Sequence, residues 1–186
     1  MGDYERGTSP KKDEKYTYKD YLSWPDDERW ELINGAAYAM SPAPKTAHQR
    51  LSVVLSSAIF NSLEDKSCEV FTAPFDVKLD EATVVQPDLS VICDKDKIDK
   101  RGCTGAPDLV VEILSDSTAY KDLTEKRFLY EKHGVREYWI INPDLPEIMQ
   151  FIRYKDKFGK PVTFSKDENL ESAVLDGFSL PVNSLY

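Results

Sequence analysis

The sequence predicts a mixed α/β (α+β) fold, in which helices flank a central mixed β-sheet, and three observations lead to this prediction. Asn34-Gly35 separates two apolar-rich runs, which is the strongest short-range signal for a β-hairpin. Apolar runs of strand length recur through the middle of the chain, for example over about 108–114. A helical pattern over about 121–133 joins two such runs, which favours a sheet with helices on its faces.

The helices are placed by their start and stop signals. Residues 17–24 predict one or two helical turns, capped by Thr17 and ended before Pro25. A long helix is expected over about 46–63, because apolar residues recur there at helical spacing. The helix over about 121–133 stops at Gly134, a typical C-terminal cap.

The strands follow from apolar runs bounded by turn residues. One run is broken at its proline, Pro74, and the run TVVQPDLSVIC is expected to form a single strand. Two more strands, REYWIIN and EIMQFIRY, are separated by Pro143 and Pro146. The predicted strand segments are 69–79, 83–93, 108–114 and these two runs.

Length and composition indicate one globular domain. A chain of 186 residues, 41% of them hydrophobic, suits a single domain over residues 16–186, with residues 1–15 as a disordered arm. The net charge of −9 disfavours a large electropositive surface and salt-driven, non-specific binding to nucleic acid. Local basic clusters remain compatible with this charge.

Cysteine usage and hydropathy indicate a cytoplasmic protein. The three cysteines are odd in number and form no CxxC pair, so the expectation is thiols in a reducing compartment and neither a disulfide framework nor a zinc site. No apolar run reaches the roughly 18 residues of a membrane span. The N-terminus is polar and does not resemble a signal peptide.

Two carboxylates stand inside apolar strands. Asp88 lies in QPDLSVI and Glu112 lies in PDLVVEIL. A buried carboxylate has to pair, take up a proton or bind a metal, and oxygen ligands suit Mg²⁺ or Mn²⁺. The alternative is structural: Asp88 caps a strand end, and Glu112 forms a buried ion pair with Lys126. Asp108, which follows Pro107 at a strand entry, is expected to be structural.

Lys126 is predicted to point toward the sheet. On a helix over 121–133 it lies in one stripe with Leu123, Leu129 and Tyr130. A charge within an apolar stripe needs a partner, and Glu112 on the preceding strand is the obvious one. The alternative is an ordinary surface pair with Asp122, four residues earlier.

These residues resemble a known family. Pro87-Asp88 followed by Glu112 is similar to the PD-(D/E)XK nuclease pattern, except that Leu114 stands where the pattern has its lysine. The segments WELINGAAYAMSPAPKTAHQRL, APDLVVEILSDST and DLTEKRFLYEKHGVREYWIINP resemble the Uma family of putative restriction endonucleases. The resemblance covers roughly residues 16–186.

The resemblance implies a restriction-endonuclease-like core with an N-terminal β-hairpin. It also implies that Asp88 and Glu112, with the backbone carbonyl of Ile113, bind Mg²⁺ or Mn²⁺. Lys126 matches the place to which the family's lysine has migrated, on the helix after the Glu strand. Glu31 and His48 match recurrent family positions and are the further candidate catalytic residues, whereas Tyr130 is expected mainly to pack.

The function expected from this resemblance is divalent-metal-dependent cleavage of phosphodiester bonds, most simply in DNA, by a homodimer. A second hypothesis is an inactive binding or assembly module in which Glu112–Lys126 is a structural pair. A third is hydrolysis of another phosphoester, although no Gly-rich phosphate loop is present. Two basic clusters offer contacts to nucleic acid: one of Lys121, Lys126, Arg127, Lys132 and Arg136, the other of Lys95, Lys97, Lys100 and Arg101.

Overall fold

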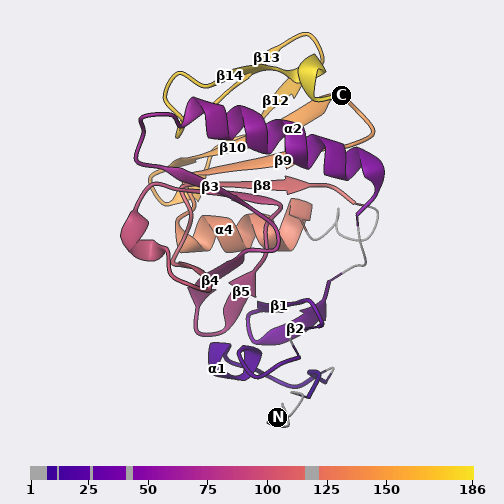
Figure 1. The fold of residues 1–186 in the computed structure, drawn as a ribbon, viewed down its shortest axis with the longest axis vertical. Helices are drawn as coiled ribbons and strands as arrows, with labels where there is room; N and C mark the ends of the chain where they lie inside the picture. Colours follow the sequence, from indigo (N-terminus) through magenta and orange to yellow (C-terminus); the bar gives the residue numbers. More distant parts are fainter. Residues whose placement is uncertain (1–7, 12, 26, 41–43, 116–121) are drawn as a thin grey trace, which may run out of the picture.

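Two β-sheets carry the fold, and helices pack on both faces of the larger one (Figure 1). The computed structural model describes residues 8–11, 13–25, 27–40, 44–115 and 122–186. The larger sheet has the strand order β11-β10-β9-β8-β6-β3, with β12 also paired to β10. Its strands are β3 (Glu69–Thr72), β6 (Leu89–Ile92), β8 (Leu109–Ile113), β9 (Glu137–Ile141), β10 (Glu147–Tyr154), β11 (Lys157–Phe158) and β12 (Val162–Ser165).

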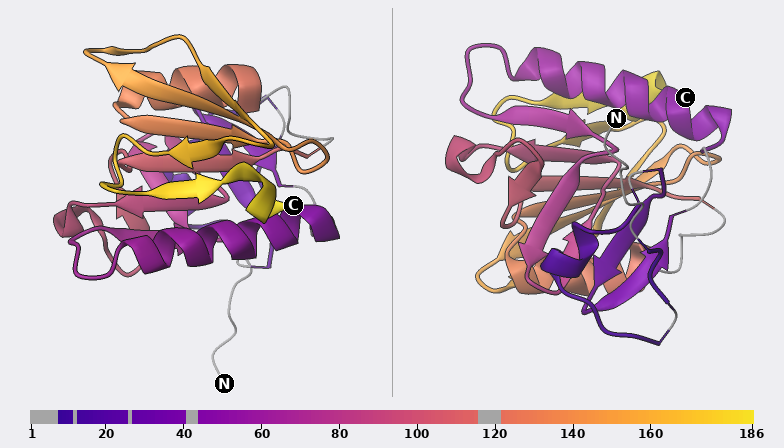
Figure 2. Two further views of the ribbon diagram at one scale, coloured as in Figure 1. Left: turned by 90° about the horizontal axis from the view of Figure 1, so that it is seen from above. Right: turned by 60° about the horizontal axis from the view of Figure 1, so that its bottom comes forward.

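The larger sheet is mixed, as the sequence predicts. β8 and β9 run parallel, whereas β6 and β8 are antiparallel. α2 (Thr46–Ser62) covers one face of this sheet, and α4 (Arg127–His133) covers the other (Figure 2). α4 continues directly from η2 (Asp122–Lys126), a stretch of π-helix, and ends at Gly134 in the left-handed conformation at φ 93°.

The strand β8 shows how the two faces are assigned. Leu109, Val111 and Ile113 pack in the core beneath α2, whereas Val110 packs in the core beneath α4. Since side chains alternate across a strand, Glu112 also faces α4. The polar residue in this apolar strand is therefore directed at the helix that carries Lys126.

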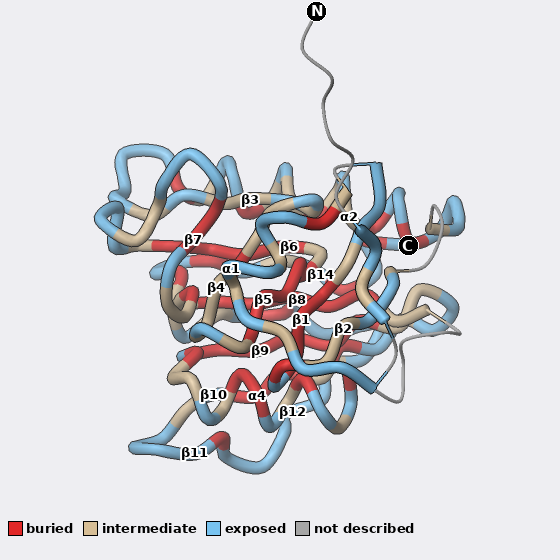
Figure 3. The backbone as a smooth tube through the Cα atoms, turned by 90° about the horizontal axis from the view of Figure 1, so that it is seen from below, coloured by how far each residue is buried: buried red, intermediate tan, exposed pale blue. Residues whose placement is uncertain are grey.

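The smaller sheet has the order β2-β1-β5-β4-β7 and contains the predicted hairpin. Its strands are β1 (Trp30–Ile33), β2 (Ala36–Ala39), β4 (Asp76–Asp80), β5 (Thr83–Val85) and β7 (Gly102–Thr104). Asn34 and Gly35 both have positive φ, 49° and 81°, as a two-residue hairpin turn requires. β1 and β5 are largely buried (Figure 3), and Figure 1 shows them below β8.

The remaining elements are short. Before the hairpin, α1 (Tyr18–Tyr21) begins at Thr17, whose side chain accepts from the backbone N–H of Asp20, as predicted. The others are η1 (Lys95–Lys97), the pair β13 (Asn169–Glu171) and β14 (Ser179–Pro181), and η3 (Val182–Leu185). Within the described residues, no helix has the length and apolarity to cross a membrane.

Two strand predictions are wrong. Residues 69–79 do not form one strand broken at Pro74, because β3 belongs to the larger sheet and β4 to the smaller one. Residues 83–93 form two strands, because the chain leaves β5 in the smaller sheet and enters β6 in the larger one. Pro87 lies at the crossing, where it has no N–H to offer to a ladder. The crossing matters for function because it sets Asp88 between the two sheets.

The cysteine prediction is also wrong. Cys68 and Cys93 form a disulfide, and Cys103 is the buried free thiol. β3 and β6 are antiparallel neighbours with Glu69 opposite Ile92, so the next pair outward is Cys68 and Cys93. Sequence spacing does not reveal this pair, because the strand register brings the two residues together.

Candidate active site

Glu112 is the central carboxylate of a buried polar cluster between β8 and α4. Its Oε1 accepts hydrogen bonds from Lys126 Nζ at 2.9 Å and from the Tyr130 hydroxyl at 2.7 Å. Lys126 and Tyr130 are four residues apart, so they lie on the same side of the helical segment. All three side chains are buried. The predicted Glu112–Lys126 contact is therefore present.

Lys126 joins carboxylates from three elements. Its Nζ lies 2.9 Å from Glu112 Oε1, 2.9 Å from Glu31 Oε1 and 3.7 Å from Asp122 Oδ1. An ammonium group has three N–H donors, and the contact to Asp122 is too long for a hydrogen bond. One donor of Lys126 is therefore left to point elsewhere in the cluster.

The π-helical stretch η2 changes which residues face inward. Lys126, Leu129 and Tyr130 are buried as predicted, but Leu123 is 36% exposed, whereas Asp122 is buried. A π-helix has a wider turn than an α-helix, so the α-helical stripe drawn through Leu123 does not hold there. The same burial removes Lys126 from the basic surface cluster, and Lys121 lies outside the described residues.

Glu31 reaches the cluster from the hairpin. It lies on β1, opposite Tyr38 of β2, and is 5% exposed. Its Oε1 accepts from the backbone N–H of Gln86 at 3.2 Å as well as from Lys126. Glu31 is thus a hairpin residue whose buried carboxylate pairs with the cluster's lysine.

Asp88 stands at the crossing between the sheets, beside the end of β8. Its Oδ2 accepts from the backbone N–H of Ile113 at 2.7 Å and lies 3.2 Å from His48 Nε2. His48 occupies the first turn of α2 and is 8% exposed. Asp88, His48 and the end of β8 therefore meet at one point, one residue beyond Glu112.

Electrostatics keep Lys126 charged and push Glu112 toward its neutral form. Burial alone would lower the pKa of Lys126, but the charges of Glu112, Glu31 and Asp122 raise it well above its ordinary value. Burial raises the pKa of Glu112 to about 8; Lys126 opposes this rise, and the carboxylates Asp122, Asp88 and Glu31 add to it. Lys126 is therefore a donor and not a base.

His48 shows the opposite balance. Burial would lower its pKa, but the hydrogen bond and the charge of Asp88, together with the backbone at Ile113 and at His48 itself, raise the pKa above its ordinary value. The imidazolium is thus favoured beside Asp88. Nδ1 of His48 has no hydrogen-bond partner among the described residues.

The free carboxylate oxygens decide whether a metal fits. Asp88 uses Oδ2 for its contacts and Glu112 uses Oε1, so Asp88 Oδ1 and Glu112 Oε2 accept no hydrogen bond within the described part of the chain. Such oxygens are the ligands that Mg²⁺ and Mn²⁺ prefer. No three Asp, Glu, His or Cys side chains of the described residues gather as a ready-made metal cluster. The residues present fit a two-carboxylate site completed by backbone or water oxygens.

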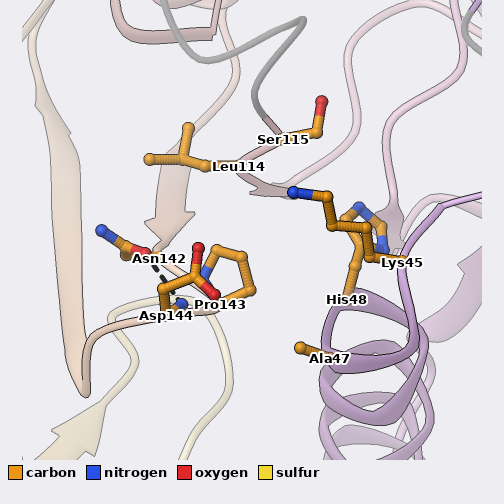
Figure 4. A pocket seen from close by; sticks show the side chains of 8 residues that line it. All are labelled: Lys45, Ala47, His48, Leu114, Ser115, Asn142, Pro143 and Asp144. Carbon is orange, nitrogen blue, oxygen red and sulfur yellow. Dashed lines mark hydrogen bonds between the residues drawn. The ribbon is translucent and has the colours of Figure 1, made fainter.

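A pocket of about 200 Å³ adjoins this point (Figure 4). It opens between the start of α2 and the carboxyl ends of the parallel strands β8 and β9, the usual place for ligands in α/β sheets. Of the predicted site residues, His48 is the one whose side chain lines this pocket. The lining residues are Lys45, Ala47, His48, Leu114, Ser115, Asn142, Pro143 and Asp144.

The structure brings together every residue that the sequence singled out, namely Glu31, His48, Asp88, Glu112, Ile113 and Lys126. Sequence reasoning missed Gln86, which holds Glu31 through its backbone N–H. The signal was its position directly before Pro87-Asp88. Tyr130, expected mainly to pack, also binds Glu112.

Comparison with known proteins agrees with this architecture. A crystal structure from Anabaena variabilis, described as a putative nuclease belonging to DUF820, superposes with a TM-score of 0.75 at 20% identity, over 91% of this chain and 96% of that one. The fold is therefore the mixed α/β fold of that neighbour. A curated relative, "Uncharacterized protein slr1290" of Synechocystis sp., is 29% identical over 92% of each chain. The Uma2 family model, described as "Putative restriction endonuclease", matches residues 18–183, and the chain belongs to this family.

Proposed function

We propose that the protein is a divalent-metal-dependent nuclease that hydrolyses phosphodiester bonds, with DNA as its substrate and Mg²⁺ or Mn²⁺ as its cofactor. One observation carries the proposal: two carboxylates, Asp88 before β6 and Glu112 on β8, each keep one oxygen that accepts from no donor among the described residues, and a buried lysine pairs with Glu112. The family and the solved neighbour support nuclease chemistry as the class of reaction.

The metal would be held by Asp88, Glu112 and the backbone carbonyl of Ile113. When bound, it supplies polarisation of the scissile phosphate and a lowered pKa for water. Asp88 is kept in place by the N–H of Ile113 and by His48. Glu112 is kept in place through Oε1, and Oε2 would be the oxygen that holds the metal.

Lys126 would act as a hydrogen-bond donor. Two of its N–H groups are engaged by Glu112 and Glu31 at 2.9 Å, and the third is available to orient the attacking water or to stabilise charge on the phosphate oxygens. Its raised pKa keeps it protonated throughout the reaction. Glu31 holds the lysine from the side of the hairpin, and His48 restrains Asp88.

The testing experiment is calorimetric titration of Mn²⁺ and Mg²⁺ into wild type, Asp88→Asn and Asp108→Asn, followed by cleavage assays on DNA and RNA. Asp108 is the matched control, because it also follows a proline and also accepts a backbone N–H, at 2.8 Å from Cys93. We expect binding and cleavage in wild type and Asp108→Asn and neither in Asp88→Asn. Metal binding that is equal in both variants, or absent from wild type, would refute the proposed site.

A second candidate is an inactive binding or assembly module, and the closure of the Lys126 cluster favours it. Lys126 already neutralises part of the charge that a metal would neutralise. The variant Glu112→Gln separates the two candidates. For a metal site, 10 mM Mg²⁺ raises the free energy of unfolding of wild type but not of the variant, since only a bound ligand stabilises. For a module, Mg²⁺ changes neither.

A further inference from the structure

Arg29 lies two residues before Glu31, the residue of β1 that belongs to the buried cluster. It directly precedes β1, and its carbonyl accepts from the N–H of Met40 at 2.9 Å, so the hairpin pairing includes it. Side chains two residues apart on a strand lie on the same face, about 6.6 Å apart. Arg29 therefore shares a face with Glu31, whose carboxylate binds Lys126, but Arg29 itself is exposed.

A buried side chain fixes one edge of this exposed guanidinium. Nε and NH2 of Arg29 donate to Gln86 Oε1, at 3.2 and 2.8 Å. Gln86 is 9% exposed, and its Nε2 lies 2.9 Å from Asp76 Oδ1 and 3.4 Å from the Tyr21 hydroxyl. The amide has one possible orientation, because arginine only donates and a carboxylate only accepts.

The other edge of the guanidinium is left for a ligand. Of the five N–H donors of Arg29, Gln86 takes one on Nε and one on NH2. The remaining NH1 and NH2 donors have no acceptor among the described residues, and they form the fork that matches two phosphate oxygens. Arg29 is thus held by Gln86, and Gln86 is in turn held by Asp76 and Tyr21.

We propose that Arg29 binds a backbone phosphate of the substrate, next to the phosphate that is cut, and that Gln86 is its positioning residue. The inference rests on the proposed function and deepens it, because it assigns a contact to nucleic acid that an acidic protein needs. The chemistry recognised is a phosphodiester, which DNA and RNA share.

Binding of a short labelled DNA duplex, measured by fluorescence anisotropy with Ca²⁺ in place of Mg²⁺, tests the proposal. Arg29→Met is compared with Lys166→Met, at an exposed lysine in the turn between β12 and β13, which belongs to neither basic cluster and whose flanking strands lie at the opposite end of the molecule from β1 (Figure 1). We expect Arg29→Met to weaken binding about tenfold to a hundredfold, as for loss of a charged hydrogen bond. The slope of log K against log salt should fall by about 0.9, one phosphate contact. Lys166→Met should stay within about twofold of wild type, because an exposed charge far from the site contributes little.

Two further variants separate positioning from charge. Arg29→Lys keeps the charge but loses the fork, so it should restore the salt slope and only part of the affinity. Gln86→Met keeps the arginine but removes its acceptor, so affinity should fall while the salt slope is retained. Melting temperatures of all variants show that each one is folded.

Single methylphosphonate substitutions in the duplex locate the contact. The uncharged linkage that weakens wild type but not Arg29→Met marks the phosphate, and we expect it beside the cleavage position. If Arg29→Met and Lys166→Met bind alike while Asp88→Asn has lost metal binding and cleavage, the inference fails and the proposed function stands. If wild type binds neither this duplex nor an RNA of the same sequence, both fail.

Discussion

Two Pro-Asp pairs lie at opposite ends of the antiparallel strands β6 and β8, and the aspartate of each pair accepts a backbone N–H from the neighbouring strand's end. Asp88 accepts from the N–H of Ile113 at 2.7 Å, and Asp108 accepts from the N–H of Cys93 at 2.8 Å. Each carboxylate thus closes the ladder where the partner strand ends. The shared motif is a strand-end cap, and the local sequence alone assigns no catalytic role to either residue.

The two ends differ in what the rest of the chain brings to them. The second oxygen of Asp108, Oδ1, accepts a hydrogen bond from the exposed Arg136 side chain at 3.0 Å. Asp88 uses the same oxygen, Oδ2, for its contacts with both Ile113 and His48. Its other oxygen, Oδ1, has no donor in the described part of the chain. A carboxylate whose two oxygens both accept hydrogen bonds is structural, whereas one that leaves an oxygen without a donor is suited to bind a ligand.

The largest expected difference is in stability, and it lies between two cations: Lys126, which pairs with Glu112 at one end, and Arg136, which pairs with Asp108 at the other. Lys126→Met removes a side chain that is 5% exposed and leaves Glu31, Glu112 and Asp122 buried without it. We expect the free energy of unfolding to fall by about 3 to 5 kcal/mol, as for breaking a buried ion pair. Urea unfolding of the metal-free protein measures this loss.

Arg136→Met is the control for that variant. The Arg136 side chain is 59% exposed, so its pair with Asp108 should contribute about 1 kcal/mol or less. Equal losses in the two variants would show that the Lys126 cluster is no more tightly coupled than a surface pair.

The next difference is that the two aspartates rank in opposite order for stability and for metal binding: Asp108 should matter more for stability, and Asp88 for metal binding. Asp108→Asn keeps an oxygen that can accept from Cys93 but removes the charge that strengthens this bond and the bond from Arg136, so it should cost about 1.5 kcal/mol. Asp88→Asn likewise keeps an acceptor for Ile113, and it removes a charge that raises the pKa of Glu112. At pH 8, where the pair with His48 contributes least, it should therefore cost less than Asp108→Asn in the absence of metal. Urea unfolding without metal measures both, and a larger loss for Asp88→Asn would make that end the structural one.

A smaller effect is expected at Tyr130. Tyr130→Phe removes the 2.7 Å bond to Glu112 Oε1 and should weaken metal binding about tenfold, the usual scale for a residue that orients a ligand. The free energy of unfolding should fall by about 1 kcal/mol. Tyr154→Phe, at a residue 74% exposed, is the control. Unchanged metal affinity in Tyr130→Phe would assign Tyr130 to packing alone.

The comparison also explains how far the sequence predicts this molecule. Asn34-Gly35, Gly134 and the helical spacing over residues 46–63 act locally, and the elements they predict are present. Lys126 could be assigned to the sheet side, since an isolated charge in an apolar stripe demands a buried partner. These inferences need no knowledge of distant residues.

Other features depend on contacts that no local pattern records. The split of residues 83–93 between two sheets, the Cys68–Cys93 pair and the inward turn of Asp122 in the π-helical stretch η2 all follow from strand order or helix geometry. The role of Gln86 is of the same kind, because it joins Glu31 to Arg29 across two strands. Each depends on register, which is set by the whole sheet.

The smallest expected effect is a difference in titration between the two ends. Asp88 raises the pKa of His48, so Asp88→Asn should lower that pKa, while Asp108→Asn leaves it unchanged. The chain has two histidines, and the pKa of His133 lies below its ordinary value because burial outweighs Asp80. In an NMR pH titration, the midpoints of the two imidazole resonances should therefore lie far apart in wild type and closer together in Asp88→Asn.

The sign of the linked stability follows from these directions. A raised pKa in the folded state stabilises fully below the unfolded pKa of about 6.5, and this contribution is lost as pH rises through the folded pKa. The stability that Asp88 gains from His48 should therefore be largest near pH 6 and shrink toward pH 8, in metal-free protein. A gap between wild type and Asp88→Asn that widens with rising pH would show that the imidazole is neutral beside Asp88.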